Sequence, residues 1–508
     1  MKLTGKNYIG GELSSKGNST YKTFNPNLNS ENNISFYEAN IEEIENAIDL
    51  ASVSFKAYQK ISDENKAIFL DEIANQIDNL GEQLIKLYTE ETGLPSGRAE
   101  NEKIRTINQI KSFSNLLREE NWKENHIDHA DSTRKPIPKP EIIKTYYPIG
   151  PVVVFTPSNF PLAFSTAGSD TISALAAGCP VIVKSHPMHS GTGELISYAI
   201  NNAILKTKMP NGIFSNLNGK KNIVGEFLVK HPKISGVGFT GSTKGGRALL
   251  NIANNRSNPI PVFAEMGSIN PVVIMEGILE SDNKKLIDQI ASSILLGAGQ
   301  FCTNPGLIII KDSIYADIFI KELSLKLDDS SEQCMLHPNI LKNFIEKSDY
   351  VEKLEGVKKI TDNKVFENNF VMPQICTLSS DNFLKDQKFQ TEVFGPFSLI
   401  VKCKTYDDII EVISNLEGQL TGTIMANIDD KDFLKNIISA LEVKVGRIIF
   451  NGVPTGVEVC KGMNHGGPYP ASSNARYTSV GIDSIKRWIR PISYQNWPQN
   501  IVENNFNY

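Results

Sequence analysis

The chain has 508 residues, of which 40% are hydrophobic and 21% are charged, and its formal net charge is −5 at pH 7. A chain of this length exceeds what a single hydrophobic core supports, so we expect two or three folded domains. The negative net charge gives no reason to expect a nucleic-acid partner, and no apolar run reaches the roughly 18 residues that a membrane span needs. Because the opening residues also lack the apolar segment of a signal peptide, we expect a cytoplasmic protein.

Apolar residues recur with helical spacing between residues 41 and 121, for example in IEEIENAIDLASVSFKAYQ. A polar connection, KENHIDHADSTRKPIPKPE, follows this helical region. From Tyr147 onward, short apolar runs such as PVVVF and PVIVK alternate with helical segments, and a second alternating series begins near Val262 and extends to GRIIFNG. This alternation is typical of parallel sheets with crossover helices, so two successive α/β domains are predicted.

The sequence contains six cysteines without the close pairs that mark zinc sites or redox motifs, so we expect free thiols and no metal site. They are Cys179, Cys302, Cys334, Cys376, Cys403 and Cys460. Most of them are expected to be buried and to act as small hydrophobic residues. Cys302 is the exception, because it lies between an aromatic residue and a threonine in the glycine-rich stretch GAGQFCTNPG.

Three predicted strands end in residues that suit a ligand site. In GVGFTGSTKGG a strand runs into Gly238 and Gly241, and a helix begins at Ser242. The first turn of this helix would present free N–H groups to a pyrophosphate. An ordinary strand-to-helix turn has the same pattern. Lys184 ends the strand in PVIVKSHP, and the alternative to a ligand contact is a solvated lysine at a strand end. Glu265 ends the strand in PVFAEMGSINP, and its alternative is a surface carboxylate. Since open α/β sheets bind ligands beyond the carboxyl ends of their strands, these residues are candidates for one site.

Six motifs occur in one order along the chain: TPSNFPLAF, ALAAGCPVIVK, GFTGS, AEMGSINP, GQFCTNPG and TEVFGPF. With this order and spacing the chain resembles the aldehyde dehydrogenase superfamily over nearly its whole length. The resemblance implies an α/β fold with a Rossmann-like dinucleotide-binding domain (residues 1–127 and 148–261), an α/β catalytic domain (262–472), and an oligomerisation β-flap and tail (128–147 and 473–508). EIIKTYYPI has strand character and an isolated two-stranded ribbon is marginal in water, so we expect pairing with a partner subunit in a homodimer or homotetramer.

The same resemblance implies catalytic roles for three residues. Cys302 would attack the aldehyde carbon to give a thiohemiacetal, and hydride transfer would leave a thioester for water to hydrolyse. Glu265 would be the general base that takes a proton from the thiol or from this water. Asn159 would meet the developing oxyanion together with the backbone N–H of the cysteine, although an asparagine before Phe160 and Pro161 also fits a simple turn.

For the cofactor, the resemblance assigns Glu392 to the nicotinamide ribose hydroxyls and Phe394 to packing at the same end. The other cofactor contacts implied in this way are Thr156, Pro157, Lys184, Ser185, Pro187, Lys221, Gly241, Ser242 and Gly246. Relatives that prefer NAD carry a glutamate at the position of Pro187, so its absence favours NADP, with Lys184 and Lys221 available to attract the 2′-phosphate. If the two lysines of NLNGKKNIVG form only a solvated loop, both NADP and NAD would be used.

Within the superfamily, NGVPTGVEVCKGMNHGGPYPASSNARYTSVG and RWIRPISYQNWP are most similar to the 2,5-dioxovalerate (α-ketoglutaric semialdehyde) dehydrogenases. This similarity implies oxidation of the semialdehyde to 2-oxoglutarate, with fatty or other aliphatic aldehydes as the alternative. The implied substrate contacts are Phe160, Phe164, Leu296, Gln300 and His465, with core packing as the alternative for Phe164 and Leu296. A 2-oxo acid needs a cation or hydrogen-bond donors at the far end of its tunnel, and the motifs assign none.

Two other classes of function are compatible with parts of the sequence. A cysteine, a glutamate and a lysine also form the working set of amidase-type hydrolases, but such an enzyme has no use for GFTGS or Glu392. A protein that kept the scaffold for binding or structure alone would not need the intact set of Asn159, Glu265 and Cys302. An NADP-dependent aldehyde dehydrogenase therefore accounts for more of the motifs than either alternative.

Overall fold

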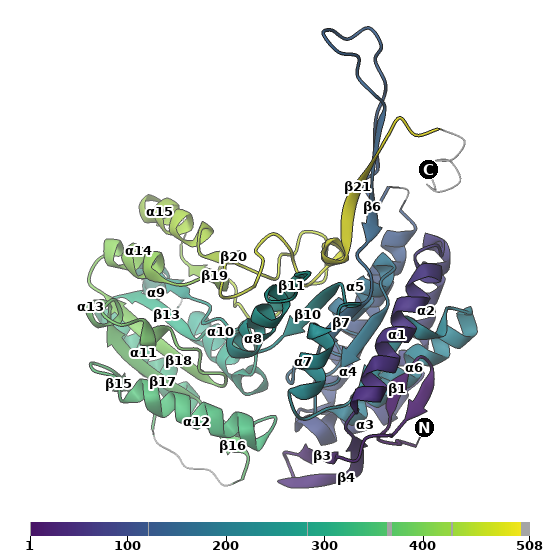
Figure 1. Cartoon of the computed structure of the whole chain (residues 1–508). Helices are drawn as coiled ribbons and strands as arrows, with labels where there is room; N and C mark the ends of the chain where they lie inside the picture. Colours follow the sequence, from purple (N-terminus) through teal and green to yellow (C-terminus); the bar gives the residue numbers. More distant parts are fainter. Residues whose placement is uncertain (1, 120, 282, 363–367, 428–429, 499–508) are drawn as a thin grey trace.

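The computed structural model describes residues 2–119, 121–281, 283–362, 368–427 and 430–498. Figure 1 shows two α/β lobes side by side and a narrow β-extension that rises from the first lobe. The first lobe holds the N-terminal helices and a mostly parallel sheet, and the second lobe holds another mostly parallel sheet. The two successive α/β series predicted from the sequence are therefore present.

The sheet of the first lobe has the strand order β11-β10-β7-β8-β9-β1-β2. Its strands are β1 (Asn7–Ile9), β2 (Glu12–Ser14), β7 (Val152–Phe155), β8 (Val181–Lys184), β9 (Phe214–Leu217), β10 (Gly236–Thr240) and β11 (Val262–Glu265). Strands β7 to β11 pair in parallel, whereas β1 is antiparallel to β2 and β9. The helices that connect the parallel strands are α5 (Ser169–Ala177), α6 (Ser190–Thr207), α7 (Ile223–Lys230) and α8 (Thr243–Asn254). The apolar strand residues are buried because helices cover both faces.

The helical region predicted for residues 41 to 121 is confirmed by four helices. They are α1 (Ile41–Tyr58), α2 (Asp63–Asp78), α3 (Gly81–Thr92) and α4 (Ser96–Leu117), and they follow a hairpin of β3 (Thr20–Asn25) and β4 (Ser30–Tyr37). Helix α1 begins at a capping box in which Asn40 and Glu43 bond to each other's backbone N–H. Helix α3 ends at Gly93, whose φ of 69° is one that glycine adopts without strain. Apolar residues of α2 and α4 join the core under the sheet.

The sheet of the second lobe has the order β15-β17-β18-β13-β12-β19-β20. Its strands are β12 (Val272–Ile274), β13 (Leu307–Lys311), β15 (Lys358–Lys359), β17 (Gln374–Ser379), β18 (Phe397–Cys403), β19 (Gln419–Met425) and β20 (Val445–Phe450), and β14 (Gln333–Cys334) pairs separately with β16 (Phe370–Val371). Its helices are α9 (Glu276–Ser281), α10 (Asn283–Leu295), α11 (Ile314–Asp328), α12 (Pro338–Glu352), α13 (Ser380–Phe383), α14 (Tyr406–Asn415) and α15 (Lys431–Glu442).

The boundary expected at residue 262 lies one strand too early. Strand β11 pairs in parallel with β10, with Thr240 opposite Glu265, so it forms the edge of the first sheet. The second sheet begins only at β12. A short apolar run is compatible with either sheet, and the backbone pairing decides which sheet it joins. Glu265 therefore reaches the interface between the lobes from the first lobe.

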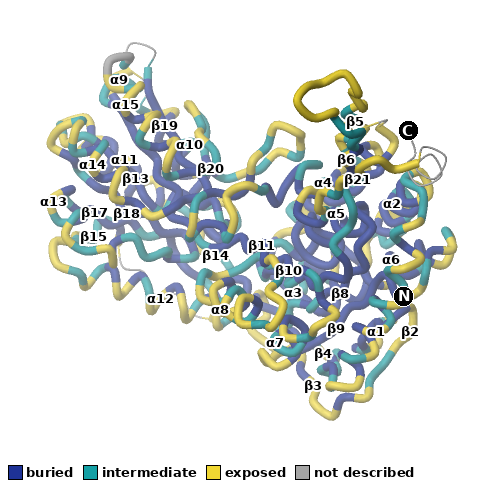
Figure 2. The backbone as a smooth tube through the Cα atoms, turned by 45° about the horizontal axis from the view of Figure 1, so that its top comes forward, coloured by how far each residue is buried: buried dark blue, intermediate teal, exposed yellow. Residues whose placement is uncertain are grey.

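The β-extension contains residues 128–147, whose role as an oligomerisation flap stays a prediction. It consists of β5 (His126–Asp128), β6 (Ile142–Pro148) and β21 (Ile489–Gln495), with β6 antiparallel to both neighbours. Figure 2 shows that the connection between β5 and β6 is exposed. The predicted extent of the tail needs correction, because η4 (Ile482–Trp488) packs into the first lobe with Ser484 and Trp488 fully buried.

The cysteines divide between core and surface. Cys179, Cys376 and Cys403 are buried as predicted, and Cys302 and Cys334 are partly accessible. Cys460 is exposed, so the expectation of a core position is wrong for this residue. In the described ranges no helix is long and apolar enough to cross a membrane, and no group of three or more His, Cys, Asp or Glu side chains is arranged to hold a metal ion.

Candidate active site

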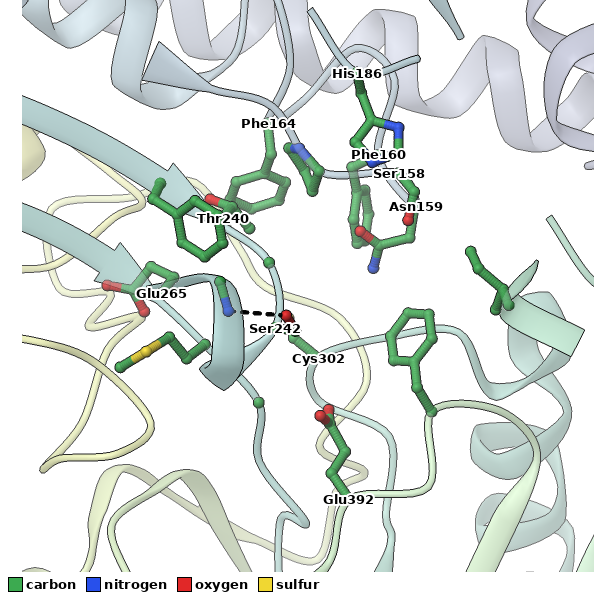
Figure 3. Close-up of a pocket in the computed structure, with 18 of the residues that line it drawn as sticks. Ser158, Asn159, Phe160, Phe164, His186, Thr240, Ser242, Glu265, Cys302 and Glu392 are labelled. Carbon is green, nitrogen blue, oxygen red and sulfur yellow. Dashed lines mark hydrogen bonds between the residues drawn. The ribbon is translucent and has the colours of Figure 1, made fainter. Parts of the chain in front are cut away.

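A cavity of about 420 Å³ lies between the two lobes. Its walls come from loops that follow the parallel strands of the first lobe and from second-lobe loops that carry Cys302 and Glu392. Figure 3 shows side chains of both lobes gathered around this space. The predicted site residues that line it are Thr156, Pro157, Asn159, Phe160, Phe164, Gly241, Ser242, Glu265, Cys302, Glu392, Phe394 and His465. The motifs that lie far apart in the sequence therefore meet at one site.

The loop that carries Cys302 has a fixed backbone. It follows the turn η2 (Leu296–Gly299), in which Ala298 has a φ of 56°. Asn270, which precedes β12, donates from Nδ2 to the carbonyl oxygens of Cys302 and Asn304, both at 2.8 Å. These two bonds hold the backbone at Cys302 and two residues after it, so the residue that carries the sulfur is tied to the segment before β12.

The Cys302 thiol is protonated at neutral pH. Burial raises its pKa to about 12, and the nearby carboxylates of Glu265 and Glu392 add to this increase. Its sulfur lies 3.7 Å from Nε2 of His465. Burial lowers the pKa of His465 to about 3, so this imidazole is neutral and does not stabilise a thiolate as a cation would. Nucleophilic attack by the sulfur therefore requires a base to remove the proton.

Asn159 lies against the loop that carries the sulfur. Its Nδ2 donates to the backbone carbonyl of Gln300 at 2.9 Å. The segment that follows is held by Glu102 of α4, whose Oε1 accepts bonds from the backbone N–H groups of Leu162 and Ala163 at 3.0 and 2.9 Å. The amide is thus positioned from both sides, as an oxyanion donor needs to be.

Glu265 shares a buried cation with a second carboxylate. Nη2 of Arg487 donates to Oε1 of Glu265 at 2.7 Å, and Nη1 donates to Asp170 at 3.0 Å. Oε2 of Glu265 is buried and has no hydrogen-bond partner among the described residues. Burial raises the pKa of Glu265 to about 8, and Arg487 opposes this rise. A carboxyl group that titrates near neutrality suits a general base, and its free oxygen can accept a proton.

The opposite side of the cavity suits a dinucleotide. Helix α8 begins there at Ser242, whose hydroxyl accepts the backbone N–H of Gly245 at 3.2 Å, and a helix N-terminus favours a phosphate. Glu392 packs directly on Gly267, where a Cβ would lie 2.2 Å from its Oε2. Burial raises the pKa of Glu392. Its carboxylate oxygens would be satisfied by the hydroxyl groups of a ribose, so the residues present fit a nicotinamide dinucleotide.

The sequence profile described as the aldehyde dehydrogenase family matches residues 13–488. The chain belongs to the aldehyde dehydrogenase family. It is 41% identical over 504 residues to α-ketoglutaric semialdehyde dehydrogenase 2 of Azospirillum brasilense, covering 99% of this chain and 96% of the relative. It is 40% identical over 500 residues to α-ketoglutaric semialdehyde dehydrogenase of Acinetobacter baylyi, covering 98% of this chain and 95% of the relative.

Solved structures of other family members share the fold of this aldehyde dehydrogenase. Betaine aldehyde dehydrogenase from Staphylococcus aureus, a point mutant in complex with NAD⁺, matches with a TM-score of 0.82 at 21% identity, over 98% of this chain and 99% of that chain. The 1-pyrroline-5-carboxylate dehydrogenase from Thermus with bound NAD matches with a TM-score of 0.82 at 20% identity, over 96% of this chain and 92% of that chain. The predicted aldehyde dehydrogenase fold is thereby confirmed.

Four of the cofactor contacts predicted for this aldehyde dehydrogenase do not line the cavity. Nζ of Lys184 donates to the carbonyl oxygens of Ser185, at 2.9 Å, and Gly219. Burial lowers the pKa of Lys184 to about 8. Pro187 is partly buried, and Lys221 is exposed at the start of α7. These residues lie around the end of β8, outside the lining of the cavity.

Three further predicted contacts are turned away from the cavity. A Cβ at Gly246 would lie 2.5 Å from Sδ of Met266, so this glycine allows α8 to pack on β11. Leu296 is 46% exposed, and the side-chain oxygen of Gln300 accepts the backbone N–H of Leu336 at 3.0 Å. In this structure Leu296 and Gln300 therefore form no part of the cavity wall, because the turn before Cys302 directs them elsewhere.

The structure adds functional residues that the sequence did not indicate. Asn270 lies inside the motif AEMGSINP, so its position within that motif is a signal that could have found it. Arg487 pairs with Glu265 across 222 positions of the chain, and Glu102 bonds to Leu162 across 60. No local pattern in the sequence indicates either of these long-range contacts.

Proposed function

We propose that this aldehyde dehydrogenase oxidises 2,5-dioxovalerate to 2-oxoglutarate with NADP. The observation that carries the proposal is the convergence of the Cys302 thiol, the Asn159 amide and the Glu265 carboxyl on one cavity whose other side suits a dinucleotide. The substrate is supported by the names of the two relatives at 41% and 40% identity.

The reaction follows from what these side chains can do. Glu265 takes the thiol proton, and the sulfur of Cys302 forms a bond to the aldehyde carbon. The resulting oxyanion is stabilised by the Asn159 amide and the backbone N–H of Cys302; one such donor lowers the barrier by about 3–4 kcal/mol. A nicotinamide held beside Glu392 and Phe394 would supply the hydride acceptor that converts the thiohemiacetal to the thioester. Glu265 passes the thiol proton to solvent and then removes a proton from water, whose oxygen attacks the thioester carbon; the C–S bond breaks, the departing thiolate takes the proton back from Glu265, and the product leaves as a carboxylate after losing its own proton to solvent.

Preference for NADP is supported by the residues at the end of β8. Lys184 provides a positive charge, and Pro187 provides no carboxylate to repel a 2′-phosphate. Glu38 is a nearby carboxylate, and its Oε1 accepts the backbone N–H of Lys220 at 2.7 Å. We infer that this engaged carboxylate weakens the preference without reversing it.

Replacing Pro187 with glutamate is expected to lower the ratio of kcat/KM with NADP to kcat/KM with NAD by about tenfold or more, because the new carboxylate repels the 2′-phosphate and can accept bonds from an unmodified ribose. Initial rates with both cofactors at a fixed aldehyde concentration measure the ratio. Pro187→Ala is the matched control and should leave it near the wild-type value. An unchanged ratio in Pro187→Glu would place the discriminating contact elsewhere.

The substrate assignment is tested by kcat/KM of the wild-type enzyme for 2,5-dioxovalerate, succinic semialdehyde and a long-chain aldehyde, each with both cofactors. We expect 2,5-dioxovalerate with NADP to give the highest value. Aliphatic aldehydes are the second candidate, since Phe160, Phe164 and Val457 form an apolar cluster beside the thiol. A higher value for the long-chain aldehyde would favour that alternative.

We further propose that the enzyme is a homodimer or homotetramer assembled through the flap. Strand β21 lies at the edge of the three-strand flap sheet, where it has a partner on one side in β6. An exposed edge strand pairs readily with another chain. Light scattering should therefore give the mass of two or four chains, and a monomeric mass at micromolar concentration would refute the assembly.

A further inference from the structure

An apolar wall extends from the thiol toward the loop after β20. The rings of Phe160 and Phe164 pack with centroids 5.1 Å apart, and the ring of Phe164 lies 6.0 Å from that of His465. Val457 packs against the same cluster. Since Nε2 of His465 lies 3.7 Å from the sulfur of Cys302, this wall borders the space that a substrate bonded to the sulfur must occupy (Figure 3).

Helix α4 brings two arginines to this wall. The guanidinium of Arg98 lies 4.6 Å from the centroid of Phe160, and that of Arg105 lies 5.2 Å from the centroid of Phe164. Arg98 has an ion-pair partner, because its Nε lies 3.5 Å from the carboxylate of Glu102. Arg105 forms no ion pair with any residue in the part of the chain that the structure describes. Of the two arginines that α4 brings to the wall, Arg105 is therefore the one whose charge is not compensated by a direct ion-pair partner.

The hydrogen-bond donors of Arg105 are only partly used. Its Nη2 donates to the carbonyl oxygen of Val457 at 3.3 Å, which orients the guanidinium plane. Its Nη1 is buried and meets no hydrogen-bond partner among the described residues. A buried, charged donor without a partner destabilises the protein, so an acceptor that reaches this nitrogen is bound favourably. An anionic acceptor gains the most, since it also compensates the charge.

Arg447 of β20 adds positive charge but has different contacts. Its Nη1 and Nη2 donate to the carbonyl oxygens of Gly456 and Pro454 at 3.0 and 2.8 Å. Both terminal nitrogens of Arg447 therefore hold the loop after β20 in place and only its Nε lacks a partner among the described residues, whereas the donor of Arg105 without a partner is the terminal Nη1. Both guanidinium groups are close enough to Cys302 to interact with it electrostatically. Apolar side chains and two guanidinium groups therefore lie on the side of the sulfur that His465 occupies.

We propose that Arg105 binds the carboxylate of the substrate through Nη1 and thereby selects oxo acids over uncharged aldehydes. The inference rests on the proposed function and deepens it, because it names the cation that the sequence motifs did not supply. Four C–C bonds separate the aldehyde and carboxylate carbons of 2,5-dioxovalerate, a span of about 5 Å when extended. The ring of Phe164 contacts both His465, beside the sulfur, and Arg105, so the cation is about one ring away from the reacting end. An alkyl chain in the same space leaves Nη1 unpaired.

The test compares the full-length enzyme with Arg105→Met, which keeps an unbranched chain without charge, and Arg105→Lys, which keeps the charge without the planar fork. Lys103→Met is the matched control, since Lys103 lies on the same helix and pairs with Asp78 at 2.8 Å, outside the cavity. Initial rates with saturating NADP give kcat and KM for 2,5-dioxovalerate, for glutaric semialdehyde and for pentanal, which has the same chain length without a carboxylate.

In Arg105→Met we expect KM for both oxo acids to rise about 100-fold with kcat changed by less than about threefold, while kcat/KM for pentanal stays equal or increases. Arg105→Lys should recover part of the oxo-acid affinity, and Lys103→Met should match the wild type. Equal losses for pentanal and for the oxo acids in Arg105→Met, or an unchanged ratio between them in both variants, would overturn the assignment.

A second measurement needs no turnover. In a Cys302→Ala background, calorimetry should detect binding of 2-oxoglutarate that weakens about 100-fold when Arg105 is changed to methionine. Undiminished binding would overturn the role of Arg105. Failure of the proposed function would give a different result: the wild-type enzyme would show no preference in kcat/KM for the oxo acids over pentanal. If the wild type prefers the oxo acids and Arg105→Met retains the preference, only the Arg105 assignment fails.

Discussion

Replacing Cys302 with alanine is expected to abolish aldehyde oxidation, with kcat/KM falling by about 10⁴-fold or more. In the proposed reaction the sulfur forms the bond to the aldehyde carbon, and among the described residues that line the cavity there is no second thiol to replace it. The neutral His465 beside it is held in the loop before η4, where its backbone N–H donates to Oγ1 of Thr478 at 2.9 Å. Its imidazole is too weakly basic to act as a substitute nucleophile. Absorbance of reduced nicotinamide, with 2,5-dioxovalerate and NADP as substrates, measures the loss.

Two controls separate loss of chemistry from loss of structure. Cys460→Ala changes an exposed thiol outside the cavity and should retain the wild-type rate. NADP should bind Cys302→Ala with a dissociation constant within about twofold of the wild-type value, since the cofactor side of the cavity is unchanged. Turnover near the wild-type rate in Cys302→Ala would remove the sulfur from the reaction.

Local sequence patterns were sufficient to predict the two parallel sheets. Strands that are buried on both faces read as continuous apolar runs, and PVVVF and PVIVK contain β7 and β8 with the boundaries that such runs suggest. Glu265 ends a strand of this sheet, so the rule that ligands bind at carboxyl ends of strands made it a candidate, whereas Asn159 was assigned through the family resemblance. Cys302 and Glu392 lie on second-lobe loops, and only the family resemblance placed them opposite.

The remaining features depend on contacts that no local pattern encodes. The three apolar residues of β11 are compatible with either sheet, and pairing with β10 decides which sheet the strand joins. Arg487 lies in a C-terminal segment that reads as part of the tail, yet it is almost fully buried and pairs with two carboxylates. Arg105 occurs in KIRTINQIKS, which has the composition of a solvated helix face. Only the contact with Phe164 places its guanidinium beside the apolar wall next to the thiol.

Replacing Glu265 with glutamine is expected to slow hydrolysis of the thioester by about 10²- to 10⁴-fold, because the amide cannot accept the proton of the attacking water. Glutamine has nearly the same shape and its carbonyl can still accept the bond from Arg487, so the fold around the cavity should persist. Because Glu265 also takes the thiol proton, the first equivalent of reduced nicotinamide should form more slowly than in the wild type in stopped-flow absorbance. The steady-state rate should fall as well, since hydrolysis of the thioester depends on the same carboxylate.

The pH dependence provides an independent check on the same residue. Burial raises the pKa of Glu265 to about 8, so at lower pH the carboxyl is protonated and cannot act as a base, and kcat should rise with pH through this value and then level off. This rise should disappear in Glu265→Gln. Arg487→Met removes the cation that opposes the effect of burial on Glu265. The pKa of Glu265 should therefore increase further, and the rise of kcat should move to higher pH. Arg487→Lys keeps a cation and should shift this rise less. A wild-type steady-state rate with an unchanged pH profile in Glu265→Gln would show that another group is the base.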